Sequence, residues 1–116
     1  MKMKRAKLLI VFLLVTIAFS SNAQSKKLVK ESFKVWGVCD MCQERIEDSS
    51  YEIKGVKFCR WNISTKIITV KYNPNKTSKE KIQKAIASIG HDTELYSAKE
   101  EDYNNLHSCC KYERKK

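Results

Sequence analysis

The stretch FKVWGVCDMCQERIEDSSYEIKG, residues 33–55, decides the fold of this chain. Its first residues alternate, with Phe33 and Val35 on one side, and the alternation stops at Gly37. This pattern predicts a strand that begins near Leu28 and ends before Gly37.

A helix is predicted directly after this strand, over residues 42–53. Apolar and small side chains recur there at the spacing of one helical face, and Gly55 supplies a stop signal. The loop Cys39-Asp40-Met41-Cys42 therefore joins a strand to a helix, with Cys39 in the loop and Cys42 on the opening helical turn.

Residues 56–72, the next segment outward, predict a β-hairpin. Cys59, Trp61 and Ile63 share one face of its first strand, and residues 67–72 alternate in the same way. Each strand thus has one face towards the core and one more solvent-exposed face. Cys59 is interpreted as a small hydrophobic residue of the core.

A second helix and a last strand are predicted after the hairpin. Thr77 and Glu80 form a capping-box pattern before a helix over residues 78–89, and residues 92–97 indicate a short fourth strand. The order strand, helix, strand, strand, helix, strand predicts an α+β, ferredoxin-like sandwich. Its four-stranded antiparallel sheet would carry both helices on one face.

The chain divides into three parts. Residues 1–23 have the basic start, the apolar run of about twelve residues and the small final residues of a secretory signal peptide. This run is shorter than the roughly 20 residues that span a bilayer, so we expect cleavage and no membrane span afterwards. Residues 28–97 form the sandwich, and residues 98–116 form a polar, cysteine-containing C-terminal tail. The chain is expected to be exported to the periplasm, or secreted where no outer membrane exists.

Charge and composition argue against several functions. The predicted cleavage removes four of the 23 basic residues and none of the 13 acidic ones, which leaves a net charge of +6. A nucleic-acid-binding surface needs basic residues interleaved with stacking aromatic residues on one face, and an exported protein seldom meets such a ligand, so nucleic acid is not an expected partner. The sequence shows no Ser/His/Asp set, carboxylate pair or glycine-rich phosphate loop, which predicts a binding protein and not an enzyme.

The five cysteines favour metal binding. Five is an odd number, and exported proteins normally pair their thiols, so a purely structural disulfide framework fits poorly. Cys39 and Cys42 lie where a helix N-terminus favours thiolates. Two thiolates suffice for Cu(I) or Hg(II), whereas structural Zn(II) sites prefer about four ligands. Cu(I) is the first choice, with Hg(II), Zn(II) and Cd(II) as alternatives.

Four further residues are candidate auxiliary ligands. His91 could bind the metal or hydrogen-bond a thiolate, or it could be a solvated residue of a surface loop. His107, Cys109 and Cys110 in the tail could complete the metal site or compete with it. Alternatively, the tail thiols could form mixed or intermolecular disulfides, because adjacent cysteines do not easily join each other.

The loop and its setting resemble the heavy-metal-associated domains of copper chaperones, of copper-transporting ATPases and of the periplasmic mercury-binding protein. The resemblance covers about residues 29–97. It implies that Cys39 and Cys42 bind the metal and that the domain passes it by ligand exchange to a metal-transporting ATPase or another metal carrier. Its further supports are Gly55-Val56, Val70-Lys71-Tyr72-Asn73-Pro74 and Ile86-Ala87-Ser88-Ile89-Gly90.

Two positions depart from the family pattern. Gly37 stands where the family usually carries methionine, and the packing is then expected from Trp36 and Met41. His91 stands where Tyr, Phe or Lys is common.

Other functions use the same loop. A scavenger of mercury or another heavy metal, or a sensor that docks on a transporter, would need the same two cysteines. A thiol-disulfide oxidoreductase also places Cys-x-x-Cys at a helix start, but in a longer α/β chain that commonly has a cis-proline beside the motif. Pro74, the only proline, instead follows the far end of the hairpin.

Overall fold

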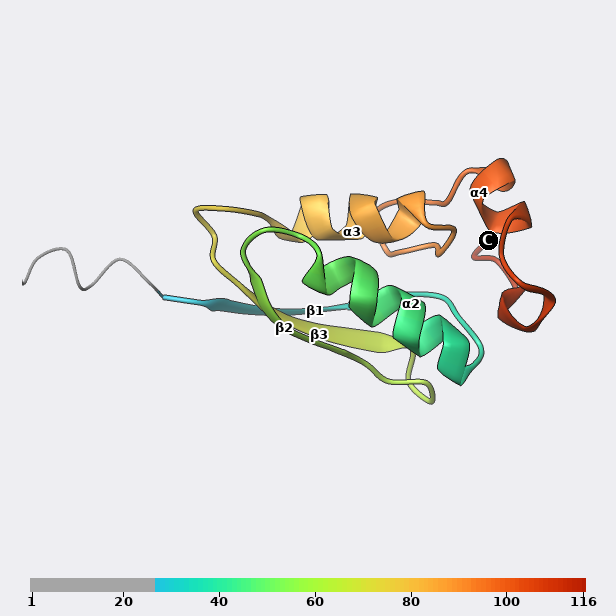
Figure 1. The fold of residues 1–116 in the computed structure, drawn as a ribbon, viewed down its shortest axis with the longest axis horizontal. Helices are drawn as coiled ribbons and strands as arrows, with labels where there is room; N and C mark the ends of the chain where they lie inside the picture. The colour runs from blue at the N-terminus through green and yellow to red at the C-terminus, as the bar shows by residue number, and fades with distance from the viewer. Residues whose placement is uncertain (1–26) are drawn as a thin grey trace, which may run out of the picture.

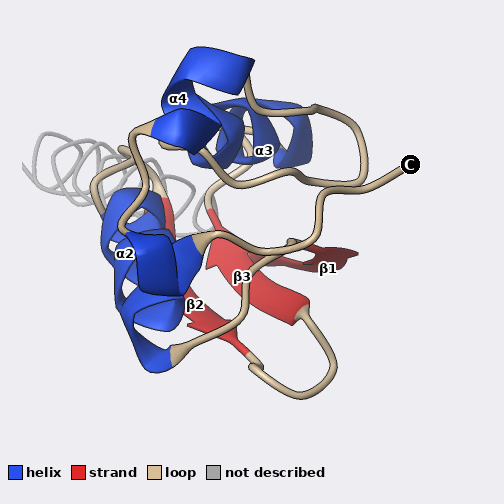
Figure 2. Cartoon of the chain, turned by 90° about the vertical axis from the view of Figure 1, so that its right-hand side faces the viewer, coloured by secondary structure: helices blue, strands red, loops and turns tan. Residues whose placement is uncertain are grey.

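A computed structural model of the chain describes residues 27–116, so the predicted signal peptide lies outside the described residues (Figure 1). The fold is α+β, with two main helices on one face of a three-stranded antiparallel sheet (Figures 1 and 2). None of the described helices is long and apolar enough to cross a bilayer. The elements are β1 (Val29–Lys34), α2 (Asp40–Tyr51), β2 (Val56–Trp61), β3 (Ile67–Tyr72), α3 (Lys79–Ser88), α4 (Glu100–Asn104) and the 3-10 turn η2 (Ser108–Cys110).

The sheet has the order β1-β3-β2, so the second strand of the hairpin lies in the centre. Ile68 of β3 faces Phe33 of β1 on one side and Trp61 of β2 on the other, and all three are buried. The helices cover these residues with Ile46 of α2 and Ile82 of α3. The predicted core faces of the strands are therefore confirmed, including the burial of Cys59.

The starts of both helices differ from the predictions by one or two residues. Helix α2 begins at Asp40, so Cys39 is its N-cap residue and Cys42 belongs to its first turn. Helix α3 is capped by Ser78, whose hydroxyl accepts a hydrogen bond from the backbone N–H of Lys81 at 3.2 Å. The prediction of Thr77 as the cap was wrong, because the Thr77 hydroxyl is buried and has no partner.

The predicted fourth strand over residues 92–97 is wrong in the described structure. Only one bridge, between Val35 and Thr93, forms beside β1. The chain turns back immediately afterwards, because the backbone N–H of Thr93 donates to the carbonyl oxygen of Tyr96. The Asp92 carboxylate accepts a bond from the backbone N–H of Ala98, which fixes this turn instead of a strand.

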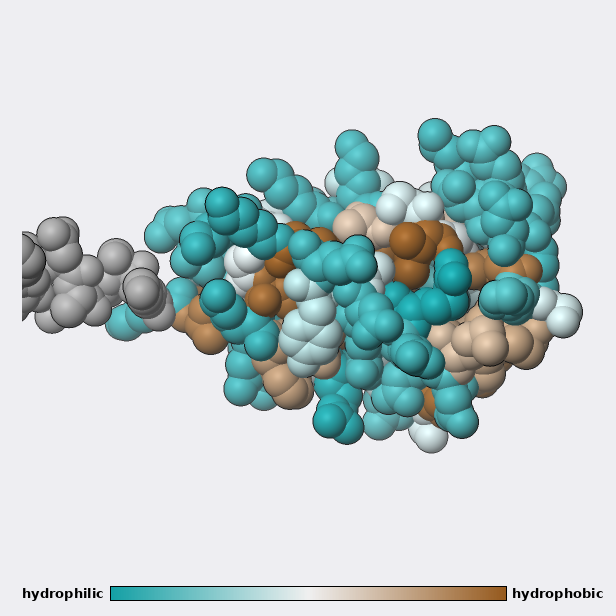
Figure 3. All heavy atoms as spheres, viewed as in Figure 1, coloured by the Kyte–Doolittle hydropathy of each residue, from teal (hydrophilic) through white to brown (hydrophobic). Residues whose placement is uncertain are grey.

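Residues 98–116, which we call the C-terminal arm, fold onto the end of the domain that carries the start of α2 (Figures 1 and 2). Leu106, Cys110 and Tyr112 are buried in the common core, although the arm is polar in sequence. The burial of these three residues makes the arm part of the folded domain. Figure 3 shows hydrophilic side chains over most of the face seen in Figure 1, with smaller hydrophobic patches between them.

Candidate metal centre

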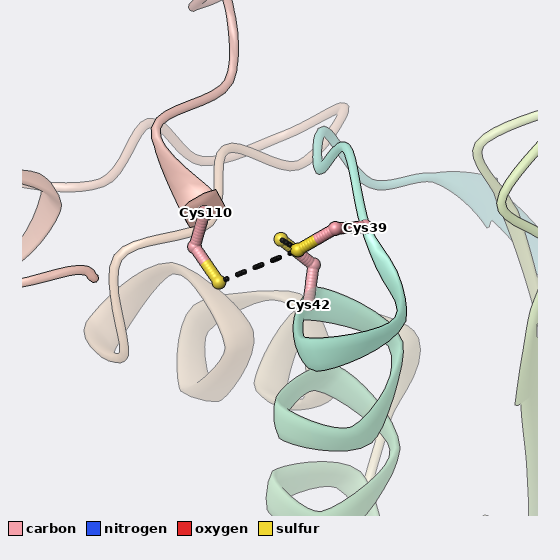
Figure 4. A group of neighbouring side chains, drawn as sticks. All are labelled: Cys39, Cys42 and Cys110. Atoms are coloured by element: carbon pink, nitrogen blue, oxygen red, sulfur yellow. Dashed lines mark hydrogen bonds between the residues drawn. The ribbon is translucent and has the colours of Figure 1, made fainter. Parts of the chain in front are cut away.

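Cys39 and Cys42 lie together at the N-terminus of α2 (Figure 4). The backbone of Cys39 is extended, as an N-cap residue requires, so its side chain turns towards the first helical turn. The two Sγ atoms are 3.4 Å apart. Cys42 is fully buried, whereas Cys39 is partly accessible.

A third sulfur comes from the arm. Cys110, 71 residues after Cys39, is buried and places its Sγ 3.7 Å from the Cys39 Sγ (Figure 4). The three sulfurs lie within 4.8 Å of one another and form the one group of this kind among residues 27–116. All five cysteines are free thiols.

The spacing of the three sulfurs fits a single soft metal ion. Three thiolates at about 2.3 Å from an ion in a trigonal arrangement lie about 4 Å apart. The observed separations of 3.4 and 3.7 Å come close to that value, so small side-chain rotations would suffice. Thiolate ligands select soft ions such as Cu(I), and they also bind Zn(II).

The electrostatic surroundings divide the thiols into two types. Burial acts to raise the pKa of Cys39, but the backbone N–H of Cys42 and the thiols of Cys42 and Cys110 lower it overall. Burial raises the pKa of Cys110, and its contacts with Cys42 and Cys39 add to the increase. Without metal, the Cys39 thiol is thus more readily deprotonated than the Cys110 thiol. Metal binding would release protons from the cluster.

Gly37 supports the loop because the Trp61 ring occupies the space beside it. A Cβ at Gly37 would lie 3.0 Å from the Trp61 ring and 3.2 Å from the Cβ of Cys42. The Trp61 indole N–H donates to the carbonyl oxygen of Val35 at 3.0 Å. Trp61 therefore provides the packing expected from Trp36 and Met41, of which Met41 is 43% exposed. Its phase in β2 predicted a core residue, but no sequence signal connected it with the loop.

His91 is a buried structural residue in this fold and lies outside the sulfur cluster. Its Nδ1 is 2.8 Å from the carbonyl oxygen of Trp36, and its ring stacks on Tyr112 with centroids 5.4 Å apart. Burial lowers the pKa of His91, although the bond to the Trp36 carbonyl opposes this change, so the ring is neutral at physiological pH. The interpretation as a solvated surface residue was wrong.

The other two candidate ligands lie at the surface, and Cys59, interpreted from the sequence as a core residue, is buried. His107 and Cys109 are exposed, and the Cys109 thiol donates to the thioether of Met41 at 3.7 Å. The Cys59 thiol is buried and donates to the carbonyl oxygen of Glu47 at 3.4 Å. Burial and the nearby Glu47 carboxylate raise the pKa of Cys59 to about 12. Cys59 is therefore an inert core thiol.

The arm is fixed to the domain by Tyr112. Its hydroxyl donates to the carbonyl oxygen of Gly90 at 2.6 Å and accepts from the backbone N–H of Asp92 at 2.8 Å. The Tyr103 hydroxyl donates to the carbonyl oxygen of Tyr112 at 2.6 Å. These bonds satisfy buried backbone groups, so they hold the segment that carries Cys110 against the domain.

An ion pair strengthens this attachment. The guanidinium of Arg114 lies 2.8 Å from the buried carboxylate of Asp92. The same guanidinium also donates to the carbonyl oxygen of Ala98. A buried carboxylate needs a hydrogen-bonded cation, and the arm supplies that cation to Asp92 through Arg114.

Comparisons of the sequence with known proteins point to one family. The sequence profile of the heavy-metal-associated domain matches residues 32–92. A zinc-transporting ATPase of Synechocystis sp. is 35% identical over 69 residues, which are 59% of this chain and 10% of that protein. The chain thus spans about a tenth of the length of this curated relative.

Solved structures show the same likeness. The CopZ metallochaperone is 26% identical, with a TM-score of 0.54 over 56% of this chain and 98% of that chain. The Cu(I)-loaded N-terminal domain of a potential copper-translocating P-type ATPase from Bacillus subtilis is 28% identical, with a TM-score of 0.57 over 64% and 94% of the two chains. Oxidized MerP from Ralstonia metallidurans CH34, 24% identical with a TM-score of 0.55 over 58% and 94%, shares the fold. The profile match ends before the arm, so Cys110 lies beyond it.

Proposed function

The chain belongs to the heavy-metal-associated domain family, and on that premise we propose that it carries a soft metal ion and passes it to a partner. Cu(I) is the first choice, bound by Cys39 and Cys42. The observation that carries the proposal is the pair of free thiols, 3.4 Å apart, at the start of α2. The likeness to CopZ and to a Cu(I)-loaded ATPase domain supports copper, while the zinc-transporting ATPase keeps Zn(II) as the alternative.

The unequal burial of the two thiols gives the transfer a direction. Cys39 is partly accessible and Cys42 is fully buried, so a thiolate from a partner meets the Cys39 side of the bound ion first. A bond from the metal to the incoming sulfur forms, and the bond to the Cys39 sulfur breaks. The metal keeps its oxidation state, and the released Cys39 thiolate takes up a proton from water. The ion then leaves Cys42 by the same exchange.

A basic hollow beside the loop supports an acidic partner. This hollow has a volume of about 680 Å³ and contains five basic and two acidic side chains. Opposite charge on a partner accelerates association and orients the encounter. We therefore propose a metal-transporting ATPase or another metal carrier with an acidic docking face. The hollow is lined by Lys34, Trp36, Gly37, Val38, Lys66, Glu94, Glu113, Arg114, Lys115 and Lys116.

We propose that the metal is transferred outside the cytoplasm. The support for this location is the signal-peptide pattern of residues 1–23 alone. Mass spectrometry of the protein recovered from an exporting host tests it. A mature chain that begins at Gln24 is expected. An intact N-terminus on protein that remains in the cytoplasm would contradict export.

The metal-binding proposal is tested by competitive titration of the reduced protein with Cu(I) and Zn(II) in the absence of oxygen. Chelators of known affinity compete for each ion, and the variant with both Cys39→Ser and Cys42→Ser is compared with Cys109→Ser, which changes an exposed thiol. One tight Cu(I) site, lost in the double variant and retained in Cys109→Ser, is expected. Absence of a tight site would disprove the proposal, and the reduction potential of the dithiol would then test the redox alternative.

A further inference from the structure

The two neighbouring cysteines of the arm lie in opposite surroundings. Cys110 is fully buried against the Cys39 sulfur, whereas Cys109 is exposed beside the thioether of Met41. Figure 4 shows the Cys110 side chain pointing from the arm towards the start of α2, where the other two sulfurs lie. The turn η2 thus directs one of its two thiols into the metal centre.

The position of Cys110 does not depend on sulfur contacts. The Tyr112 hydroxyl bridges two backbone groups of the domain, and Arg114 pairs with Asp92. Leu106 packs so closely against Gly90 that a Cβ there would lie 3.0 Å from the Leu106 side chain. Contacts that hold a ligand in place before binding reduce the ordering cost of binding. Cys110 is therefore available without rearrangement of the backbone.

We propose that Cys110 is the third ligand of the metal ion, so that the C-terminal arm completes a three-thiolate centre with Cys39 and Cys42. This inference rests on the proposed function, because it concerns the same centre. Each thiol that becomes a ligand loses one proton to water, and no electron is transferred. Soft ions that accept three thiolates, Cu(I) first, are the class of ligand that fits the 3.4 and 3.7 Å separations.

The third ligand changes the balance between holding and transferring the metal. A partner thiolate that displaces Cys39 still meets an ion bound to two sulfurs, one on the domain and one on the arm. Transfer then requires breaking a bond to Cys110, which is fully buried. The centre is therefore expected to hold Cu(I) more tightly and release it more slowly than a two-thiolate loop of the same domain.

The test uses the reduced full chain loaded with one equivalent of Cu(I). X-ray absorption at the copper edge counts the bound sulfurs, and chelator competition measures the affinity. Cys110→Ser is compared with its neighbour Cys109→Ser, which serves as the matched control. We expect about three sulfurs in the wild type and in Cys109→Ser, about two in Cys110→Ser, and an affinity at least about tenfold lower in Cys110→Ser alone. Cys110→Ala repeats the measurement if the buried serine impairs folding.

The outcomes separate this inference from the proposed function. Equal sulfur counts and affinities in wild type, Cys110→Ser and Cys110→Ala would overturn the third ligand and leave the Cys39/Cys42 proposal intact. Retention of tight binding without Cys39 and Cys42 would instead overturn the proposed function. A two-sulfur wild-type centre whose affinity is unchanged in Cys110→Ser also contradicts the inference.

Discussion

The loop before α2 and the C-terminal arm place their thiols by different physical means. The loop holds Cys39 and Cys42 through local structure, because the end of β1 and the first turn of α2 bring two residues three positions apart together. The arm holds Cys110 through long-range contacts, mainly those of Tyr112 and Arg114 with residues 90–92. Damage to the loop should therefore remove the whole centre, whereas damage to the arm should remove one ligand.

The largest effect is expected from Gly37→Met, which breaks the loop. The Cβ of the new side chain would press against the Trp61 ring at 3.0 Å and the Cys42 Cβ at 3.2 Å, and overpacking of this kind costs about 1–3 kcal/mol. We expect a lower free energy of unfolding in urea and weaker Cu(I) binding. Val38→Met, a change at a neighbouring exposed position, is the control. Full stability and affinity in Gly37→Met would refute the role assigned to Trp61.

A combined change sharpens this prediction. Trp61→Val makes room for the methionine of Gly37→Met, so the two changes together should cost less than the sum of the single changes. Part of the loss should remain, because the indole bond to the Val35 carbonyl is absent. Additive losses of unfolding free energy in urea would show that contact with the Trp61 ring is not the cause of the destabilisation by Gly37→Met.

A smaller effect is expected from Tyr112→Phe, which loosens the arm and leaves the loop unchanged. The change leaves the Gly90 carbonyl and the Asp92 N–H without their partner, at a cost of about 1–2 kcal/mol. Hydrogen exchange of the arm should accelerate, and Cu(I) affinity should fall without being abolished. Tyr51→Phe, at a half-exposed tyrosine of α2, is the control and should leave the exchange of the arm unchanged. Loss of all Cu(I) binding in Tyr112→Phe would show that loop and arm are not separable.

Acid should weaken the arm selectively. Burial acts to raise the pKa of Asp92, but the bonds from Arg114 and from the Ala98 backbone lower it overall. Because the pKa of Asp92 is lowered in the folded state, its ionised carboxylate stabilises the fold above the unfolded-state pKa of about 3.9. This stabilisation is lost as the pH falls through the lower, folded-state pKa. Urea unfolding of the metal-free protein below about pH 4 should show this loss in the wild type. Asp92→Asn should be less stable at neutral pH and lack this acid-dependent step; an identical profile would contradict the assignment.

The smallest effect is expected from Lys66→Glu in the basic hollow, which borders both regions. The change should leave Cu(I) affinity unchanged, because Lys66 contacts none of the three sulfurs. It should slow transfer to an acidic partner, and added salt should reduce the difference between the variant and the wild type. Stopped-flow transfer to such a partner at two salt concentrations is the measurement. Lys57→Glu, an exposed residue of β2 outside the hollow, is the control.

The sequence predicted the parts of the molecule that periodicity governs. The pattern around residues 33–55 placed Cys39 and Cys42 at the start of a helix, and the hairpin phase placed Cys59 and Trp61 in the core. The fourth strand was mispredicted because the turn from Thr93 to Tyr96 and the capping of Ala98 by Asp92 compete with the sheet. Propensity carries little information on such side-chain bonds.

The arm was not predictable, because its attachment depends on few and non-periodic residues. Tyr112 is one of two aromatic residues in a polar tail, and its partners are backbone groups some 20 residues earlier. Both His91 and Cys110 were candidate auxiliary ligands, and the docking of the arm decides between them: His91 stacks on Tyr112, whereas Cys110 joins the sulfur cluster. No local sequence feature of the tail distinguishes Cys110 from Cys109. The two cysteines differ only because the turn η2 docks on the domain and buries Cys110.

Because His91 stacks on Tyr112, we expect the segment that unfolds as one unit to extend beyond the family domain. The family profile ends at residue 92, yet the buried core continues to Tyr112 and the ion pair to Arg114. A fragment cut at residue 97 would leave the His91 ring and the Asp92 carboxylate uncovered, and it would lack one of the three clustered sulfurs. Excision, domain grafting or tagging should therefore treat residues 28–114 as one piece.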